Sequence, residues 1–143
     1  MHAVGRADNS CSVKIINCMS RIFLLIGFGG FIGSICRYYS QQLIARFFLS
    51  TFPYGTLAVN IIGCFLVGII FGFADKGNVL SPEWRMFLAT GFCGGFTTFS
   101  TFSYESTQLI NNGEYLYLAL YISASVIIGI LATFAGFVLT RLI

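Results

Sequence analysis

The chain has 143 residues, of which 57% are hydrophobic and 9% are charged, and its mean hydropathy is +0.85. A soluble domain usually carries about 25% charged residues, so this composition excludes a water-soluble globule and indicates a membrane protein. The net charge of +3 comes from single charges scattered along the chain, which argues against a nucleic-acid partner.

The amino-terminal segment, residues 1–20, mixes charged, small and polar residues and precedes any long apolar run. It lacks the charged-then-apolar layout of a cleavable signal peptide. We therefore predict a disordered polar leader over residues 1–20 and one transmembrane domain over residues 21–143.

Four apolar runs follow the leader, and each is close to the ~20 residues that a helix needs to cross the hydrocarbon. They lie at about Ile22–Ile44, Tyr54–Ala74, Met86–Phe102 and Tyr115–Leu139. Short polar breaks separate the runs, and Ser81 followed by Pro82 is typical of a capped helix start. The pattern predicts an all-α, multi-pass membrane protein with four transmembrane helices.

The first two runs contain polar side chains that hydrocarbon disfavours, and each is therefore a functional candidate. Arg37 lies deep in the first run, where it either anchors at the membrane interface or gives an anion entrance a positive potential. Thr56 and Asn60 lie one turn apart on the second run, so their side chains point the same way. They either bond across a helix interface or face a transported substrate.

The third run places three glycines and five hydroxyl residues, all within residues 91–103, in the middle of an expected membrane helix. Glycine and threonine are poor helix formers, so we expect the helix to break near Gly94 to Thr97. Carbonyl groups freed by a break must face water, protein or a bound cation. Phe99 and Phe102 then project from one face, where their ring edges suit an anion path, with ordinary packing as the alternative.

The end of the third run and the fourth run add further candidates. Glu105 is a natural ion-pair partner for an arginine, and Tyr117, Tyr121 and Ser125 form one stripe at four-residue intervals. Such a stripe serves either packing or a pore. We do not expect an enzyme, because the sole histidine, His2, lies in the leader and no nucleophile has a base at a suitable spacing.

The third run resembles the signature of the Fluc/CrcB fluoride channel family. The residues that carry the resemblance are Gly94-Gly95-Phe96-Thr97-Thr98-Phe99-Ser100-Thr101-Phe102-Ser103, followed by Glu105. Residues 29–38 and 55–63 resemble the first two helices of that family, and the match runs from about Met19 to the carboxyl end. Phe96 stands where many members have leucine.

The resemblance implies an antiparallel, dual-topology homodimer in the cell inner membrane, with two narrow pathways for passive fluoride export along its interface. The partners would be the fluoride ion, membrane lipid and a second copy of the chain, although a paralogue could replace that copy. A structural Na⁺ ion would be held by the backbone carbonyls of Gly94 and Thr97. The fluoride pathway would be lined by Phe99, Phe102, Asn60, Thr56, Tyr121 and Ser125, with Arg37 in the vestibule.

Two other function classes stay open at this point. A small multidrug-type, proton-coupled exporter is also a four-helix, dual-topology dimer, but it needs a membrane-embedded acid, and the first span offers only Arg37. A structural membrane protein without transport activity would leave the glycine- and hydroxyl-rich third run unexplained. Unaltered fluoride tolerance after deletion of the gene would favour that class.

Overall fold

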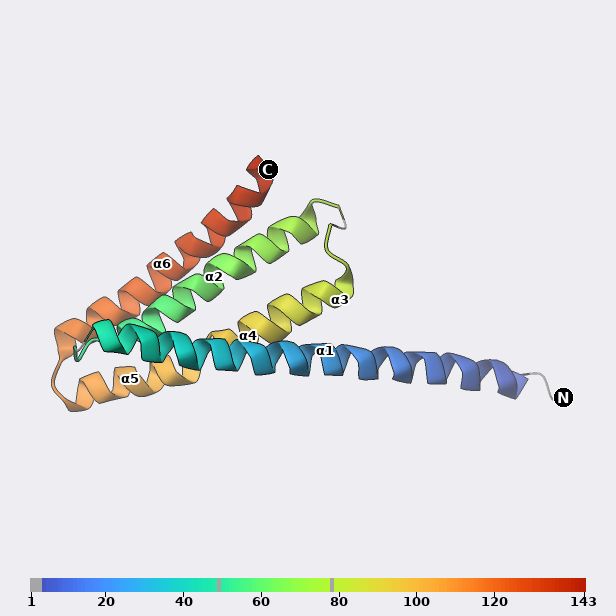
Figure 1. The fold of residues 1–143 in the computed structure, drawn as a ribbon, viewed down its shortest axis with the longest axis horizontal. Helices are drawn as coiled ribbons and strands as arrows, with labels where there is room; N and C mark the ends of the chain where they lie inside the picture. Colours follow the sequence, from blue (N-terminus) through green and yellow to red (C-terminus); the bar gives the residue numbers. More distant parts are fainter. Residues whose placement is uncertain (1–3, 49, 78) are drawn as a thin grey trace.

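The computed structural model describes residues 4–48, 50–77 and 79–143, with side chains from Met19 onward. Every regular element in these ranges is helical (Figure 1). Along the chain they are α1 (Val4–Phe47), α2 (Tyr54–Asp75), α3 (Pro82–Arg85), the π-helix η1 (Met86–Cys93), α4 (Gly94–Phe96), α5 (Phe99–Asn111) and α6 (Tyr115–Leu142).

Within the described residues, three helices have the length and hydropathy to cross a membrane without interruption. They are Met19–Phe47 within α1, Tyr54–Asp75 and Tyr115–Leu142. The third span is shared among α3, η1, α4 and α5, and residues 97 and 98 between α4 and α5 are not helical. The predicted all-α, multi-pass architecture of four spans with a broken third helix is confirmed.

The first helix is the longest element of the structure. It begins at Val4, so the backbone of residues 4–20 is helical and continuous with the first span, whereas a disordered leader was expected. No proline interrupts residues 4–47, so the helix has no sequence signal that would end it earlier. This end of α1 extends beyond the other helices (Figure 1). The domain boundary at residue 20 stays a prediction.

The helices pack as two close pairs, with α2 against α6 and α1 against η1 and α4. Glycines make this approach possible. A Cβ atom on Gly68 would overlap the carbonyl oxygen of Thr133, and one on Gly33 would overlap the carbonyl oxygen of Phe92. Small residues at such contacts are typical of helix packing in membranes, where van der Waals contact holds the spans together.

The start of the third span follows its predicted chemistry. Ser81 Oγ accepts a hydrogen bond from the Trp84 N–H at 3.4 Å, and Pro82 is the first residue of α3. A serine cap followed by proline satisfies one of the free N–H groups of a helix end and loses none that the helix needs. The predicted helix start is confirmed.

Candidate functional site

The third span is interrupted at two threonines. Thr97 and Thr98 have extended backbones, with φ/ψ of −85°/157° and −149°/114°. The predicted break is therefore confirmed, but Gly94 and Gly95, which were expected to contribute to it, are helical. Gly95 has a packing role instead, because a Cβ atom there would overlap the carbonyl oxygen of Gly30 on α1.

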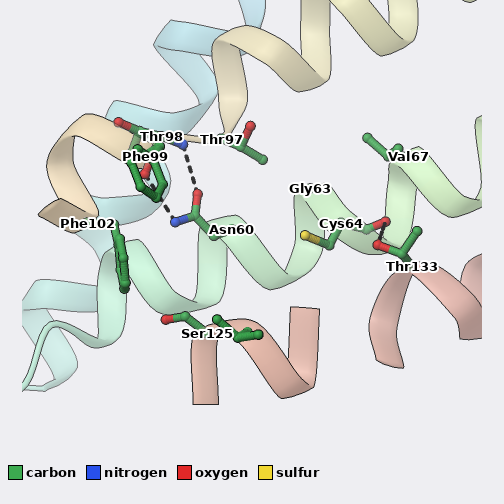
Figure 2. A pocket seen from close by; sticks show the side chains of 11 residues that line it. Asn60, Gly63, Cys64, Val67, Thr97, Thr98, Phe99, Phe102, Ser125 and Thr133 are labelled. Carbon is green, nitrogen blue, oxygen red and sulfur yellow. Dashed lines mark hydrogen bonds between the residues drawn. The ribbon is translucent and has the colours of Figure 1, made fainter. Parts of the chain in front are cut away.

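Asn60 of α2 holds the interrupted backbone. The Thr98 N–H donates to Asn60 Oδ1 at 2.8 Å, and Asn60 Nδ2 donates to the Thr98 carbonyl oxygen at 3.2 Å, as the dashed lines in Figure 2 show. A break inside a membrane leaves backbone groups that water cannot reach, and each must find a partner. One side-chain amide supplies both partners for Thr98.

The interruption also changes the partners of two carbonyl groups. In a continuous α-helix the Thr98 N–H would bond the Gly94 carbonyl, and the Thr101 N–H would bond the Thr97 carbonyl. Here the Thr98 N–H bonds Asn60, and the Thr101 N–H donates to Thr98 Oγ1 at 3.2 Å as the N-cap of α5. The carbonyl oxygens of Gly94 and Thr97 are thus relieved of their usual helical donors.

A groove of about 350 Å³ lies against this interruption, between α2, the start of α5, and α6 (Figure 2). Phe99 is 79% exposed at the groove, and its ring centroid lies 5.7 Å from that of Phe102. Ser125 Oγ is buried without a hydrogen-bond partner among the described residues. The lining residues are Asn60, Gly63, Cys64, Val67, Thr97, Thr98, Phe99, Phe102, Ser125, Val126 and Thr133.

A second, more polar chamber of about 280 Å³ lies where α1 ends and α2 begins, and Thr56 and Glu105 are among its lining residues. Thr56 Oγ1 donates to Glu105 Oε1 at 2.7 Å, and the Tyr121 hydroxyl donates to Glu105 Oε2 at 2.7 Å. The Glu105 carboxylate is therefore held by two hydroxyl groups.

No arginine in the described part of this chain pairs with Glu105. Among the described side chains the ion pairs are Arg21 with Glu83 at 3.5 Å and Arg141 with Asp75 at 3.9 Å. A hydroxyl donor satisfies a carboxylate oxygen without bringing a second charge into the membrane, and two of them lie within reach of Glu105.

The family model described as CrcB-like protein, Camphor Resistance (CrcB), matches residues 24–137. The chain belongs to the CrcB family.

Three curated relatives, each named fluoride-specific ion channel FluC, show the extent of the similarity. The protein of Flavobacterium psychrophilum is 45% identical over 123 residues, which is 86% of this chain and 98% of the relative. The protein of Leptospira interrogans is 47% identical over 117 residues, 82% of this chain and 92% of the relative. That of Campylobacter jejuni is 45% identical over 123 residues, 86% of this chain and the full length of the relative.

The structure divides the site residues predicted for this CrcB-family chain between two places. The groove collects Asn60, Thr97, Phe99, Phe102 and Ser125. The hydrogen-bond network around Glu105 contains Thr56 and Tyr121.

The two places meet at one aromatic contact, because the ring centroids of Phe102 and Tyr121 are 5.0 Å apart. Gly94 is exposed and lines neither place, and Arg37 lines neither as well. The Nε atom of Arg37 is buried without a hydrogen-bond partner among the described residues.

Sequence reasoning missed three residues of this CrcB-family site. Thr98 belongs to the family signature, yet its role as the cap of α5 depends on a backbone conformation that no pattern displays. Cys64 lines the groove one turn after Asn60. Gln41 lines the polar chamber four residues after Arg37, and that spacing on one helix face was the signal that could have drawn attention to it.

Proposed function

We propose that this chain is a fluoride channel that lets fluoride leave the cell passively and so lowers its cytoplasmic concentration. The observation that carries the proposal is the interruption at Thr97 and Thr98, which lies against a groove with polar groups and aromatic rings, in a chain whose CrcB-family relatives are named fluoride-specific channels. Interrupted helices at membrane depth are tolerated where they line a pathway or a cavity.

Fluoride is small and strongly hydrated, so a pathway must replace its water with hydrogen-bond donors. Asn60 Nδ2 carries two hydrogens, and the bond to the Thr98 carbonyl uses one of them. The Ser125 hydroxyl has no partner among the described residues and can direct its hydrogen into the groove. Donors from α2 and α6 thus remain available to an anion on two sides of the groove.

Aromatic rings complete the proposed lining. Phe99 and Phe102 lie at the start of α5, with ring centroids 5.7 Å apart and ring planes 37° apart. The edge of a phenyl ring carries partial positive charge, so edges turned toward the groove would favour an anion over a cation. Arg37 lies outside the groove and the polar chamber, and its positive charge on α1 would favour anions over cations at longer range.

The groove is open on one side, and this supports a dimer. Phe99 is 79% exposed beside buried polar groups, an arrangement that lipid tails would not satisfy. The open face continues past Val67 and Thr133 into an apolar groove between α2 and α6. An antiparallel second copy of the chain would cover this face and close two equivalent pathways.

A structural Na⁺ ion fits the chemistry of the interruption. The carbonyl oxygens of Gly94 and Thr97 have lost their usual helical donors, and backbone oxygens at a broken helix are the ligands that sodium takes in membrane transporters. Two copies of the chain would bring two such pairs of oxygens together. The bound ion would supply fixed positive potential between the two pathways.

Fluoride efflux tests the proposal. Liposomes that contain the purified chain and are loaded with potassium fluoride should release fluoride within seconds of adding a potassium ionophore, as read by a fluoride electrode. Chloride-loaded liposomes from the same preparation should retain their chloride. Retained fluoride, in a preparation whose protein elutes as a single folded species, would reject the channel.

A further inference from the structure

We propose that Gln41, at the end of the first span, is a positioning residue for conduction, because its amide holds the Thr56 hydroxyl in the orientation that donates to Glu105, the carboxylate that also holds Tyr121. The inference rests on the proposed channel function. It concerns a residue that is not among those lining the groove.

The hydrogen bonds of this region form one connected network that takes one side chain from each span. Gln41 Nε2 of α1 donates to Thr56 Oγ1 of α2 at 3.0 Å, and Thr56 donates in turn to Glu105 of α5 at 2.7 Å. Tyr121 of α6 donates to the other oxygen of Glu105 at 2.7 Å. Thr56 and Tyr121 are almost completely buried, so water cannot replace these partners.

Gln41 supports the direction in which the network runs. An amide nitrogen can only donate and a carboxylate can only accept, so Thr56 Oγ1 accepts from Gln41 and its single hydrogen points to Glu105. Without the amide, the Thr56 hydroxyl loses the partner on α1 that fixes its orientation. A Thr56 side chain that rotated away would leave the carboxylate with one hydroxyl donor, that of Tyr121.

The packing of the first two spans places Gln41 where it can act. A Cβ atom on Gly55 would lie 3.5 to 3.6 Å from the Cα, carbonyl oxygen and Cβ atoms of Gln41, so α1 and α2 lie close enough here for an added methyl group to make ordinary contact with Gln41. Gln41 also lines the polar chamber together with Thr56 and Glu105. Its side chain therefore has one buried partner on α2 and one open side.

The network reaches the groove through an aromatic contact. The Tyr121 ring, held by its bond to Glu105, packs on Phe102 with ring centroids 5.0 Å apart, and Phe102 lines the groove. A Glu105 carboxylate that lost a donor would also present more unshielded negative charge to a passing anion. Both effects predict slower fluoride conduction when the Gln41 amide is removed.

Gln41→Glu gives a test in which the rate of fluoride efflux should depend on pH. The new carboxylate matches glutamine in shape but has no hydrogen, so Thr56 would donate to it rather than to Glu105. When that carboxyl takes up a proton it becomes a donor, and the original direction returns. The charged or titratable groups that face it are Glu105 on α5, Tyr121 on α6 and Tyr54 on α2, with Arg37 one turn earlier on α1.

The experiment measures fluoride efflux from vesicles of the wild type and Q41E between about pH 8 and about pH 5.5, a range in which a carboxyl beside a second carboxylate gains a proton. We expect Q41E to conduct about tenfold more slowly than the wild type at the alkaline end, as for a lost charge-assisted hydrogen bond. At the acid end of the range it should approach the wild-type rate. Protein-free vesicles at each pH correct for the leak of hydrogen fluoride.

Two further variants sharpen the result. Gln41→Met keeps the length of the side chain without the amide, and it should conduct more slowly than the wild type at every pH. Gln42→Glu adds the same charge to the same chamber from an exposed neighbour, and it should show no comparable pH-dependent recovery. Recovery within one preparation of Q41E cannot arise from misfolded protein, because the same vesicles are measured at both pH values.

The outcomes separate this inference from the channel proposal. Wild-type vesicles that release no fluoride at any pH would reject the channel function itself. If the wild type conducts, the positioning role is overturned by any of three results: Q41E conducts at the wild-type rate throughout, it is slow without recovery, or Q42E shows the same profile.

Discussion

The second and third spans contain similar residues and yet have different backbones. Helix α2 carries Thr56, Asn60 and Gly63 and runs unbroken over 22 residues, whereas the third span is interrupted directly after Phe96. In α2 the polar side chains bond outward and leave the backbone of the helix intact. In the third span a side chain of α2 competes for the backbone itself. The helix is interrupted where a side chain of another helix bonds its backbone groups. Glycine content alone does not interrupt it.

The strongest way to break this comparison is to change the partner. Asn60→Asp keeps the acceptor for the Thr98 N–H but loses the donor to the Thr98 carbonyl and adds a negative charge beside the groove. Like charges about 4 Å apart at an effective dielectric constant of about 20 repel by about 4 kcal/mol, so we expect fluoride efflux to fall at least about 100-fold.

The control for Asn60→Asp is Asn111→Asp, which makes the same change at an exposed position at the end of α5. It should leave efflux near the wild-type rate. Full conduction by the Asn60 variant would remove that residue from the pathway.

The glycines of the third span offer the second test. If Gly95 serves packing, Gly95→Ala must push α1 away, because the new Cβ atom overlaps the carbonyl oxygen of Gly30. Overpacking of this kind costs about 2 kcal/mol of unfolding free energy, to be measured by denaturant titration in detergent. Gly27→Ala has no atom within 4 Å of its Cβ and should be neutral or slightly stabilising. Equal stability of the two variants would contradict the packing role.

Phe99→Ile tests whether the aromatic ring beside the interruption contributes to conduction. Isoleucine keeps the apolar character but has no positive ring edge, so fluoride efflux should fall about tenfold while the oligomeric state stays unchanged. Phe23→Ile makes the same replacement at a 63% exposed position on α1 that lines neither the groove nor the apolar groove between α2 and α6, and it should conduct normally. An unimpaired Phe99 variant would leave the ring without a part in conduction.

The smallest expected effect concerns the cap of α5. Thr98→Val removes the hydroxyl that accepts from the Thr101 N–H and should lower the unfolding free energy by about 1 kcal/mol. Thr107→Val is the matched control, because that exposed hydroxyl only bonds the Ser103 carbonyl within its own helix. The same denaturant titration compares them, and an equal loss in both would show that the cap adds nothing.

Much of the fold could be predicted because the bilayer imposes it. Four apolar runs of about 17 to 25 residues mark four spans, and Ser81 with Pro82 marks one helix start. The broken third span was also predictable from its hydroxyl and glycine residues. The residue at which the helix stops was not, because that depends on Asn60, which lies 38 positions from Thr98 in the sequence.

The hydrogen-bond network shows where sequence reasoning ends. Glu105 was expected to pair with an arginine because opposite charges attract, but its two partners are hydroxyl groups brought in by α2 and α6. Gln41 belongs to no motif of the sequence, and its hydrogen bond to Thr56 of α2 becomes visible only in the fold. Partner choice among four helices depends on their relative rotation, and one sequence does not state that rotation.

An experimental density map of the purified chain with bound fluoride tests the central claim most directly. The account predicts a helix interrupted at Thr97 and Thr98, with an anion within hydrogen-bond distance of Asn60 Nδ2 or Ser125 Oγ and beside the ring edge of Phe99. A third span that runs continuously through these threonines, with the Phe99 ring against lipid and no anion near Asn60, would contradict it.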